Sequence, residues 1–293
     1  MKKISYYPGC TLKSTAKNFE DSTLYILDKL KVPFEELDKW YCCGTVFSLT
    51  TDNLIHHIAP IRNLVRTRKT GSDTLLTLCS MCYSTLKSSN ERVKNNPEEL
   101  ERINNFMWKE ETQYKGDVKI IHLLELLKDE IGFETITSKT KKPLNNLNVS
   151  SYYGCMLVRP REIAIDDVEN PMIMEDLMSS IGAEAIDFPL KTECCASYQT
   201  LTDPDIIASR TRQIIDSART QGAEIISVSC PLCAFNLDQR QKNVQKLYPD
   251  FKNMPVIYFT QLLAIALGCS RDELRLDLHH IDPMPILKEK GLF

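Results

Sequence analysis

The residues best suited to chemistry in this sequence are its eleven cysteines, ten of which follow one spacing twice. In each copy a single cysteine is followed by an adjacent pair and then by a Cys-x-x-Cys motif. The gaps between these groups are 31 and 35 residues in the first copy and 38 and 34 in the second. The two sets are Cys10, Cys42, Cys43, Cys79 and Cys82, and then Cys155, Cys194, Cys195, Cys230 and Cys233. Such close agreement predicts a duplicated domain.

Residues around the cysteines repeat as well. The stretch YYPG at residues 6–9 precedes the first cysteine, and YYG at residues 152–154 precedes its counterpart, which leaves Pro8 unmatched. Lys39 and Lys191 each lie three residues before a cysteine pair. The second pair is followed by Ala196, where the first is followed by a glycine. These repeats support the duplication, with small departures beside an intact thiol set.

The N-terminal sequence and the absence of long apolar runs bear on the state of the thiols. The chain begins MKKISYYP, without the apolar stretch of a signal peptide, and contains no run of about 18 apolar residues. We therefore expect a cytoplasmic protein without a membrane segment. The cytosol keeps thiols reduced, so metal binding or redox chemistry explains the cysteines better than structural disulfides do.

Length and charge narrow the class of protein. The 293 residues are 43% hydrophobic, enough for one large domain or two of ordinary size. The formal net charge is −3, and Lys and Arg are spread along the chain without a basic tail or stripe. A nucleic-acid partner is therefore not expected.

The arrangement of apolar segments predicts an α/β fold. Short apolar or β-branched runs alternate with helical patterns, and we expect strands at residues 4–7, 74–78, 118–121, 149–153, 225–229 and 256–259. Two further segments, residues 34–37 and 185–188, precede the cysteine pairs. We expect two homologous domains, each a small, mostly parallel sheet flanked by helices. Ligands bind beyond the carboxyl ends of such strands, where five thiols per domain should converge.

Helix signals and composition set the expected boundaries. Apolar residues at i, i+3, i+4 and i+7 over residues 174–181, ended by Gly182, predict one helix, and Asp203-Pro204 predicts the start of another. The expected domains span residues 1–131 and 149–268. A polar linker at 132–148 joins them, and residues 269–293 form a C-terminal tail.

Five thiols, two of them adjacent, restrict the metal that each domain could hold. A closed zinc site uses four ligands, and so does the simplest cubane iron–sulfur cluster. A zinc-binding interaction protein would leave one thiol of five without a role. Five thiolates suit an enlarged cluster, in which neighbouring thiolates reach different irons or one thiolate bridges two irons.

The repeated Cys, Cys-Cys-Gly, Cys-x-x-Cys arrangement resembles the duplicated CCG domain of the heterodisulfide reductase B subunit of methanogenic archaea, and the resemblance covers nearly the whole chain. This resemblance implies that each five-cysteine set carries a noncubane [4Fe-4S] cluster. It also implies that the two clusters face each other across the mixed disulfide of coenzyme M and coenzyme B, an intermediate of methanogenesis. On this basis the ten cysteines are the cluster ligands, and no catalytic residue is expected beyond them.

The resemblance also implies partners. The chain lacks a ferredoxin-type cysteine run and a Gly-x-Gly-x-x-Gly fingerprint, so electrons must come from other chains. The family obtains them from a ferredoxin-like C-type subunit and a flavin-containing A-type subunit, with a hydrogenase or formate dehydrogenase as donor.

A substrate with sulfonate and phosphate ends would need cationic anchors near the clusters. The candidates, chosen by their position next to cysteines, are Lys13, Lys39, Arg159, Arg161 and Lys191. We expect each cluster to deliver one of the two electrons that disulfide cleavage requires.

The remaining candidate residues are expected to be structural. Cys269 has no counterpart in the first half and fits a structural thiol. The pairs 56–57 and 279–280 are adjacent histidines, which point in different directions on a helix and fit packing roles. The alternatives to a disulfide reductase are a CCG-type electron-transfer subunit of another oxidoreductase and the zinc-binding interaction protein.

Overall fold

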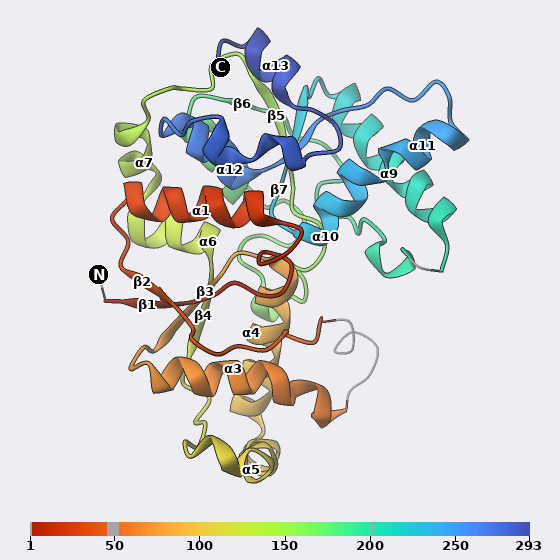
Figure 1. Cartoon of the computed structure of the whole chain (residues 1–293). Coiled ribbons are helices and arrows are strands. Elements are labelled where there is room, and N and C mark those ends of the chain that lie inside the picture. The colour runs from red at the N-terminus through yellow and green to blue at the C-terminus, as the bar shows by residue number, and fades with distance from the viewer. Residues whose placement is uncertain (1, 46–52, 201) are drawn as a thin grey trace.

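The computed structural model describes residues 2–45, 53–200 and 202–293 and contains two sheets of four parallel strands each (Figure 1). The strand orders are β2-β1-β3-β4 and β6-β5-β7-β8, so both sheets have the same topology. The bounds are β1 Ile4–Tyr7, β2 Phe34–Glu36, β3 Thr74–Thr77, β4 Lys119–His122, β5 Asn148–Tyr152, β6 Glu184–Ala185, β7 Ile225–Val228 and β8 Val256–Tyr258. The predicted α/β class and the predicted duplication are confirmed.

Helices follow the strands in both halves (Figure 1). In the first half they are α1 Lys17–Lys29, α3 Ile58–Lys69, α4 Ser80–Asn95, α5 Pro97–Phe106, α6 Leu123–Glu125 with the π-helical turn η3 Leu126–Ile131, and α7 Phe133–Lys139. In the second half they are α8 Ile173–Ser180, α9 Pro204–Thr220, α10 Pro231–Ala234, the π-helical turn η6 Phe235–Gln239, α11 Gln241–Leu247, α12 Phe259–Ala266 and α13 Met284–Glu289. Short 3₁₀ turns are η1 Leu54–His57, η2 Trp108–Glu110, η4 Arg161–Ile163, η5 Ser197–Gln199, η7 Asp272–Leu274 and η8 Leu276–Leu278.

Two predicted helix signals have the expected geometry. The side chain of Asp203 accepts hydrogen bonds from the backbone N–H groups of Asp205 and Ile206, which caps α9. Helix α8 ends at residue 180, and Gly182 follows with a φ of +89°. A positive φ favours glycine, so this residue terminates the helix as its position in the sequence indicates.

The segment predicted as a polar linker is packed against the protein. It contains α7, and Leu144 and Leu147 are fully buried. The hydroxyl of Thr137 donates to the carbonyl of Ser180 at 2.8 Å, which ties α7 to the end of α8. The connection between the halves therefore carries core residues of its own.

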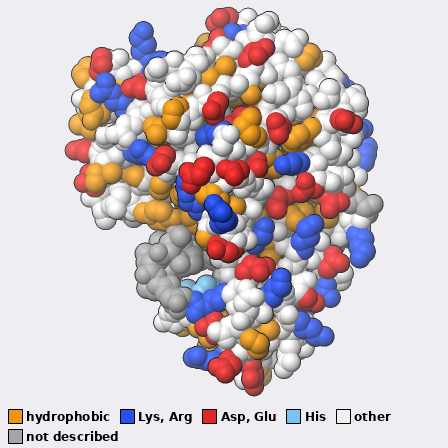
Figure 2. Space-filling view, turned by 180° about the vertical axis from the view of Figure 1, so that it is seen from behind, with side chains coloured by type: hydrophobic (Ala, Val, Ile, Leu, Met, Phe, Trp, Pro, Cys, Tyr) orange, Lys and Arg blue, Asp and Glu red, His pale blue; other side chains and the backbone are white. Residues whose placement is uncertain are grey.

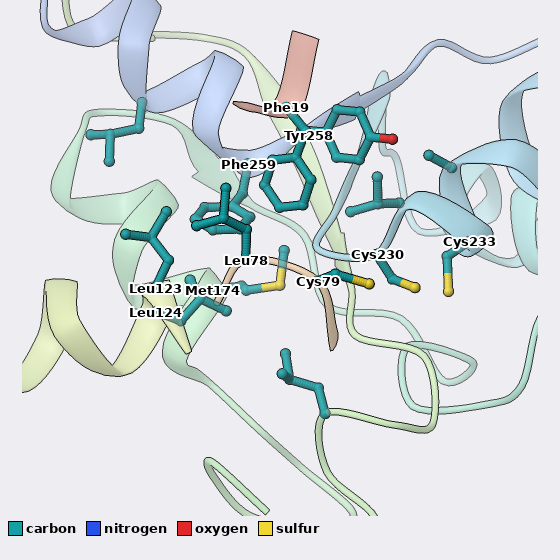
Figure 3. Packing of buried hydrophobic residues seen from close by; sticks show 14 of the residues in the cluster. Phe19, Leu78, Cys79, Leu123, Leu124, Met174, Cys230, Cys233, Tyr258 and Phe259 are labelled. Atoms are coloured by element: carbon teal, nitrogen blue, oxygen red, sulfur yellow. The ribbon is translucent and has the colours of Figure 1, made fainter. Parts of the chain in front are cut away.

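The halves share one continuous hydrophobic core. Helix α1 of the first half packs against α12 of the second (Figure 1). Phe19 on α1 stacks on Tyr258 with ring centroids 4.3 Å apart (Figure 3). The tail after residue 268 adds buried Leu274 and Leu287 to the same core. The sheets are therefore held in a fixed relation by shared packing.

On the face shown in Figure 2, basic and acidic side chains are interspersed rather than gathered into areas of one sign. None of the helices in the described residues combines the length and the apolar character that crossing a bilayer requires.

Candidate metal centre

The parallel strands bring the predicted cysteines to the carboxyl edge of each sheet. Cys79 follows β3 and Cys230 follows β7, each two residues after the last strand residue and each opening the helix that continues the chain. Cys10 and Cys155 follow the central strands β1 and β5 at three residues. The topology therefore places equivalent cysteines of the two halves at equivalent positions.

In the first set, sulfurs from separate segments lie in contact. The Sγ atoms of Cys10 and Cys42 are 3.9 Å apart, and those of Cys43 and Cys82 are 3.5 Å apart. Cys10 and Cys42 are exposed, whereas the other three thiols are buried. The set thus has one edge open to solvent.

The second set repeats these contacts in a more enclosed form. The Sγ atoms of Cys195 and Cys233 are 3.7 Å apart, and the thiol of Cys155 lies beside that of Cys194. Cys155 and Cys194 are half-buried.

The two sets meet at the boundary between the halves. Cys79 and Cys230 are neighbours across this boundary, and their thiols lie side by side in Figure 3. The hydroxyl of Ser80 donates to the carbonyl of Ser229 at 3.1 Å beside them. Because equivalent residues of the two copies touch, the halves face each other head to head.

A glycine in each half makes room for the last cysteine of its set. A Cβ on Gly9 would lie 3.1 Å from the Sγ of Cys82, and a Cβ on Gly154 would lie 3.1 Å from the Sγ of Cys233. Both glycines have positive φ, at +76° and +65°. Backbone and sulfur approach each other closely here, and only glycine fits without strain.

Hydrogen bonds of the tyrosines before the first cysteines correct the expected alignment of the two halves. Tyr7 donates its hydroxyl to the carbonyl of Tyr41, immediately before the first cysteine pair, and Tyr152 donates to that of Glu193, immediately before the second. Tyr7 is therefore the equivalent of Tyr152. Pro8, which lacked a counterpart in the sequence comparison, corresponds to Tyr153.

The residue after each cysteine pair adopts the left-handed conformation in both halves. Gly44 has a φ of +74°, and Ala196 keeps this geometry with φ +61° and ψ +26°. The backbone N–H of Ala196 donates to the Sγ of Cys194 at 3.3 Å. The conformation is thus retained after glycine is replaced, at the expense of strain in the alanine.

Contacts among the thiols raise the pKa of some cysteines and lower the pKa of others. Hydrogen bonds from Cys42 and then Cys82 hold the pKa of Cys43 well below its usual range, whereas donation to Cys43 and burial raise the pKa of Cys42. In the second half a hydrogen bond from Cys155 lowers the pKa of Cys194 to about 6, with help from backbone N–H groups and from Arg210. Thiolate, the form that ligates metals, is therefore favoured at one member of each pair.

Polar groups beside the sulfurs differ between the halves. Asn236, three residues after Cys233, donates its side-chain amide to the carbonyl of Cys195 at 3.0 Å and lies 3.7 Å from its sulfur. At the same position in the first half, Thr85 lies beside Cys43 and donates its hydroxyl to that of Thr45 at 3.0 Å. Sequence inspection missed this pair, although both residues stand three positions after the last cysteine of their set.

One aromatic residue spans the boundary above the thiols. The hydroxyl of Tyr198 lies 3.8 Å from the Sδ atoms of both Met81 and Met156, which belong to different halves. Burial and the charges of neighbouring cysteines raise its pKa. No sequence signal pointed to this residue, because the position three residues after the first cysteine pair is Val46 and the tyrosine is therefore not repeated.

The five predicted anchors do not converge on one point. The ammonium group of Lys13 lies 2.7 Å from carboxylates of both Glu20 and Glu36. Lys191 is buried, with its ammonium 3.3 Å from Glu175 and 2.9 Å from Asp187.

The other three anchors are Lys39, Arg159 and Arg161. Lys39 lines a separate surface cavity of the first half with Arg66 and Lys109. Arg159 and Arg161 line one cavity together, at the boundary between the halves.

Other candidate residues lie outside the cysteine sets. The thiol of Cys269 is buried 3.8 Å from Glu273, and burial raises its pKa to about 12. His122 pairs in register with Thr77, as Tyr258 pairs with Val228. Complete burial lowers the pKa of His122 to about 4, so the ring is neutral, and its Nε2 lies 2.6 Å from the carbonyl of Leu78.

The arrangement of the ten cysteines indicates which kind of metal centre they fit. Among the described residues, no cluster of three or more His, Cys, Asp or Glu side chains is arranged to hold a single metal ion. The thiols instead form two groups of five in which sulfurs from separate segments touch at 3.5 to 3.9 Å. Cysteine sulfur is the ligand that iron–sulfur groups use in proteins. The residues present therefore fit such a group.

Comparison with known proteins identifies a family and relatives that match nearly the whole chain. The cysteine-rich domain family CCG matches twice, at residues 4–87 and 149–238. The chain is 30% identical to the 8-methylmenaquinol:fumarate reductase membrane anchor subunit of Wolinella succinogenes, over 96% of this chain and 98% of the relative. It is also 30% identical to the B-type polypeptide of the ferredoxin/F(420)H(2)-dependent CoB-CoM heterodisulfide reductase of Methanosarcina acetivorans, over 98% of this chain and 96% of the relative.

Among solved structures, a hypothetical protein from Helicobacter pylori matches with a TM-score of 0.75 and 18% identity. The match covers 95% of this chain and 52% of that one, and it shows a shared fold.

Proposed function

Because the chain belongs to the cysteine-rich CCG family and is homologous to the B-type polypeptides of heterodisulfide reductases, we propose that it is the disulfide-reducing subunit of an iron–sulfur oxidoreductase. In this proposal each five-cysteine set holds one noncubane [4Fe-4S] cluster. The observation that carries the proposal is the meeting of the two sets at Cys79 and Cys230, where sulfurs of both halves lie together.

This juxtaposition suits a two-electron substrate. Reducing a disulfide consumes two electrons and two protons and releases two thiols. When bound, the clusters would supply the electrons, one from each set. The chain's own part is to hold both sets on one rigid core, so that the two sulfurs of a disulfide can face different sets at once.

The ligands are the ten cysteines, and other residues support them. Gly9 and Gly154 keep the backbone clear of Cys82 and Cys233. Asn236 holds the buried member of the second cysteine pair by donating to the carbonyl of Cys195, and Thr85 lies beside the buried member of the first. Tyr198, with its hydroxyl between Met81 and Met156, covers the boundary with a soft, sulfur-rich surface.

The specific substrate we propose is the disulfide of coenzyme M and coenzyme B, as in the named activity of the Methanosarcina relatives. The complex would include a ferredoxin-like iron–sulfur subunit and a flavin subunit, fed by a hydrogenase or a formate dehydrogenase. Relatives named as heterodisulfide reductase subunits support an assembly of several chains.

The test is metal analysis followed by turnover, on protein prepared without oxygen. We expect about eight irons with similar sulfide and little zinc, the content of two four-iron clusters. Reduced viologen should then convert the mixed disulfide to two thiols. One or two zincs without sulfide would instead indicate a structural role.

A second candidate function is electron transfer without a disulfide substrate. It is favoured by the 30% identity to a subunit of a menaquinol:fumarate reductase, a relative whose name contains no disulfide. Protein with the expected iron that oxidises a reduced partner, yet reduces no disulfide, would favour this alternative.

A further inference from the structure

The hydroxyl of Tyr198 lies at the boundary between the two cysteine sets and has weak partners there. It is 3.8 Å from the Sδ of Met81, which stands inside the first Cys-x-x-Cys motif, and 3.8 Å from the Sδ of Met156, which follows Cys155 directly. Among the described residues, this hydroxyl has no nitrogen or oxygen partner. A thioether sulfur is a weak acceptor, so the hydroxyl is free to donate to a stronger acceptor at the boundary.

The turn that carries Tyr198 is fixed by hydrogen bonds of its own. Ala196 precedes the turn η5 in the left-handed conformation, and the backbone N–H of Gln199 donates to its carbonyl at 2.9 Å. The hydroxyl of Thr200 donates to the carbonyl of Ser197 at 2.7 Å. Because the turn directly follows the second cysteine pair, it holds the ring in a fixed place beside that set. A donor held in this way needs little reorganisation when charge develops near it.

The surroundings of Tyr198 keep its hydroxyl protonated. Partial burial raises the pKa of this tyrosine, and the charges of the neighbouring Cys155, Cys194 and Cys230 raise it further. A tyrosine that keeps its proton near neutral pH acts as a hydrogen-bond donor. The side chain is 41% exposed, so a small molecule at the boundary has access to it.

The duplication does not repeat this hydroxyl. Counted from the first cysteine pair, the position equivalent to Tyr198 is occupied by Val46, whose side chain carries no hydroxyl. At this position of the repeat, one half therefore supplies a donor and the other does not. The two sulfurs of a disulfide between the sets would then have unequal surroundings.

We propose that Tyr198 donates a hydrogen bond to one sulfur of the bound disulfide, and that this bond strengthens as the sulfur becomes a thiolate. This inference rests on the proposed function. Two electrons break the S–S bond and leave two thiolates, which take up two protons from water and depart as thiols. The tyrosine keeps its own proton throughout. Hydrogen bonds to charged acceptors are stronger than those to neutral ones, so the contact favours the cleaved state over the intact disulfide.

The first test is binding of each product thiol to cluster-loaded protein prepared without oxygen. Coenzyme M and coenzyme B are titrated separately by calorimetry. Tyr198→Phe keeps the ring and removes the hydroxyl. It should weaken binding of one thiol by about tenfold, leave the other unchanged and keep all iron. Unchanged affinity for both thiols, or equal weakening of both, would overturn the assignment.

The matched control is Tyr41→Phe. Tyr41 is a tyrosine of similar exposure, at 46%, and it directly precedes the first cysteine pair. Its hydroxyl accepts a hydrogen bond from Nη2 of Arg66 at 3.3 Å. This variant should leave both thiol affinities at the wild-type value.

A second variant separates hydrogen-bond donation from simple cover of the boundary. Tyr198→fluorotyrosine keeps the ring and the hydroxyl, but its O–H group is more acidic and is therefore a stronger donor. It should bind the same thiol more tightly than wild type, whereas a residue that only covers the boundary would not respond. If Tyr198→Phe loses iron, this variant decides: tighter binding supports the assignment and unchanged affinity overturns it.

Turnover separates this inference from the proposed function. With reduced viologen and the mixed disulfide, Tyr198→Phe should lower kcat by about tenfold and leave KM nearly unchanged, since the hydrogen bond strengthens as charge develops. If the thiol affinities change as expected but wild-type protein never reduces the disulfide, the reductase function fails and the assignment of Tyr198 stands. If wild type reduces the disulfide and Tyr198→Phe keeps its kcat and both affinities, the assignment fails and the reductase function stands.

Discussion

The first half of the chain leaves two of its five thiols exposed, whereas the second half covers all five at least in part. Cys10 and Cys42 are open to solvent, and their equivalents Cys155 and Cys194 are half-buried. The second half also places the guanidinium of Arg210 close to Cys194, through a 3.0 Å hydrogen bond to its carbonyl. Counted back from the Cys-x-x-Cys motif, the position equivalent to Arg210 in the first half is Ala59.

The comparison separates two kinds of requirement. The sulfur positions, the glycine before the first cysteine and the left-handed residue after the cysteine pair are the same in both halves. The solvent cover of the thiols and the charges beside them differ. Both halves therefore require the same geometry around the sulfurs. The residues around that geometry can differ and give the halves different roles.

The largest expected effect tests whether the halves hold separate groups. Cys43→Ser and Cys195→Ser remove equivalent buried thiols, and each should lose roughly half of the bound iron, because one Cys-ligated group is disrupted. Iron analysis of the purified variants measures this. Cys269→Ser is the matched control and should keep all iron, and loss of all iron from either single variant would show that the two groups are not independent.

The glycines before the first cysteines test whether the halves are equally constrained. Gly9→Ala and Gly154→Ala each place a Cβ about 3.1 Å from a sulfur at positive φ. Both should lower the free energy of unfolding by about 2 kcal/mol or more, from strain and overpacking. Denaturant unfolding measures the effect. Clearly unequal losses would mean that one half adjusts its backbone more easily than the other.

A difference in pH dependence should follow from His122, whose equivalent is Tyr258. The buried ring has a pKa of about 4 against an ordinary 6.5, so the unfolded chain binds the proton more readily. Stability contributed by the neutral ring is present above pH 6.5 and is lost as the pH falls towards 4. From about pH 7.5 to about pH 5.5 the loss should be about 1 kcal/mol.

The control for this effect is His122→Asn, which keeps an acceptor for the backbone N–H of Leu124. Its stability should be lower at every pH, with a shallower decline over the same interval. An identical slope in both proteins would assign the pH dependence to other groups.

The smallest effect concerns the left-handed residue. Ala196→Gly should raise the free energy of unfolding by about 0.5 to 1 kcal/mol, since glycine adopts φ +61° without strain. Gly44→Ala should lower it by about 1 kcal/mol. Thermal unfolding of the two variants measures the expected gain in stability for Ala196→Gly and the expected loss for Gly44→Ala. A destabilised Ala196→Gly would show that the alanine methyl group makes stabilising contacts.

Much of the fold follows from local sequence. Apolar runs after residues 73 and 224 predict β3 and β7 because parallel strands are buried on both faces. Capping by Asp203 is equally local. The packing of the segment 132–148 was not predictable, since its few apolar residues, among them Leu144, are buried by α8 and α12 from elsewhere in the chain.

The candidate site was predictable in its ligands and less so in its surroundings. Cysteine spacing identifies the ten thiols because a repeated interval survives without knowledge of the fold. The position of Tyr198, between methionines of both halves, depends on how one half lies against the other. That arrangement follows from packing of α1 against α12, which spacing alone does not encode.

The packing of α1 against α12 has a consequence for the origin of the molecule. A chain of half this length would leave one face of each helix without apolar cover, and would expose the thiol that Cys79 and Cys230 now shield for each other. Two identical short chains would satisfy both needs by pairing face to face, as in an isologous dimer. The duplicated chain is then equivalent to such a dimer in one polypeptide, in which each half was free to acquire its own charges and its own solvent cover.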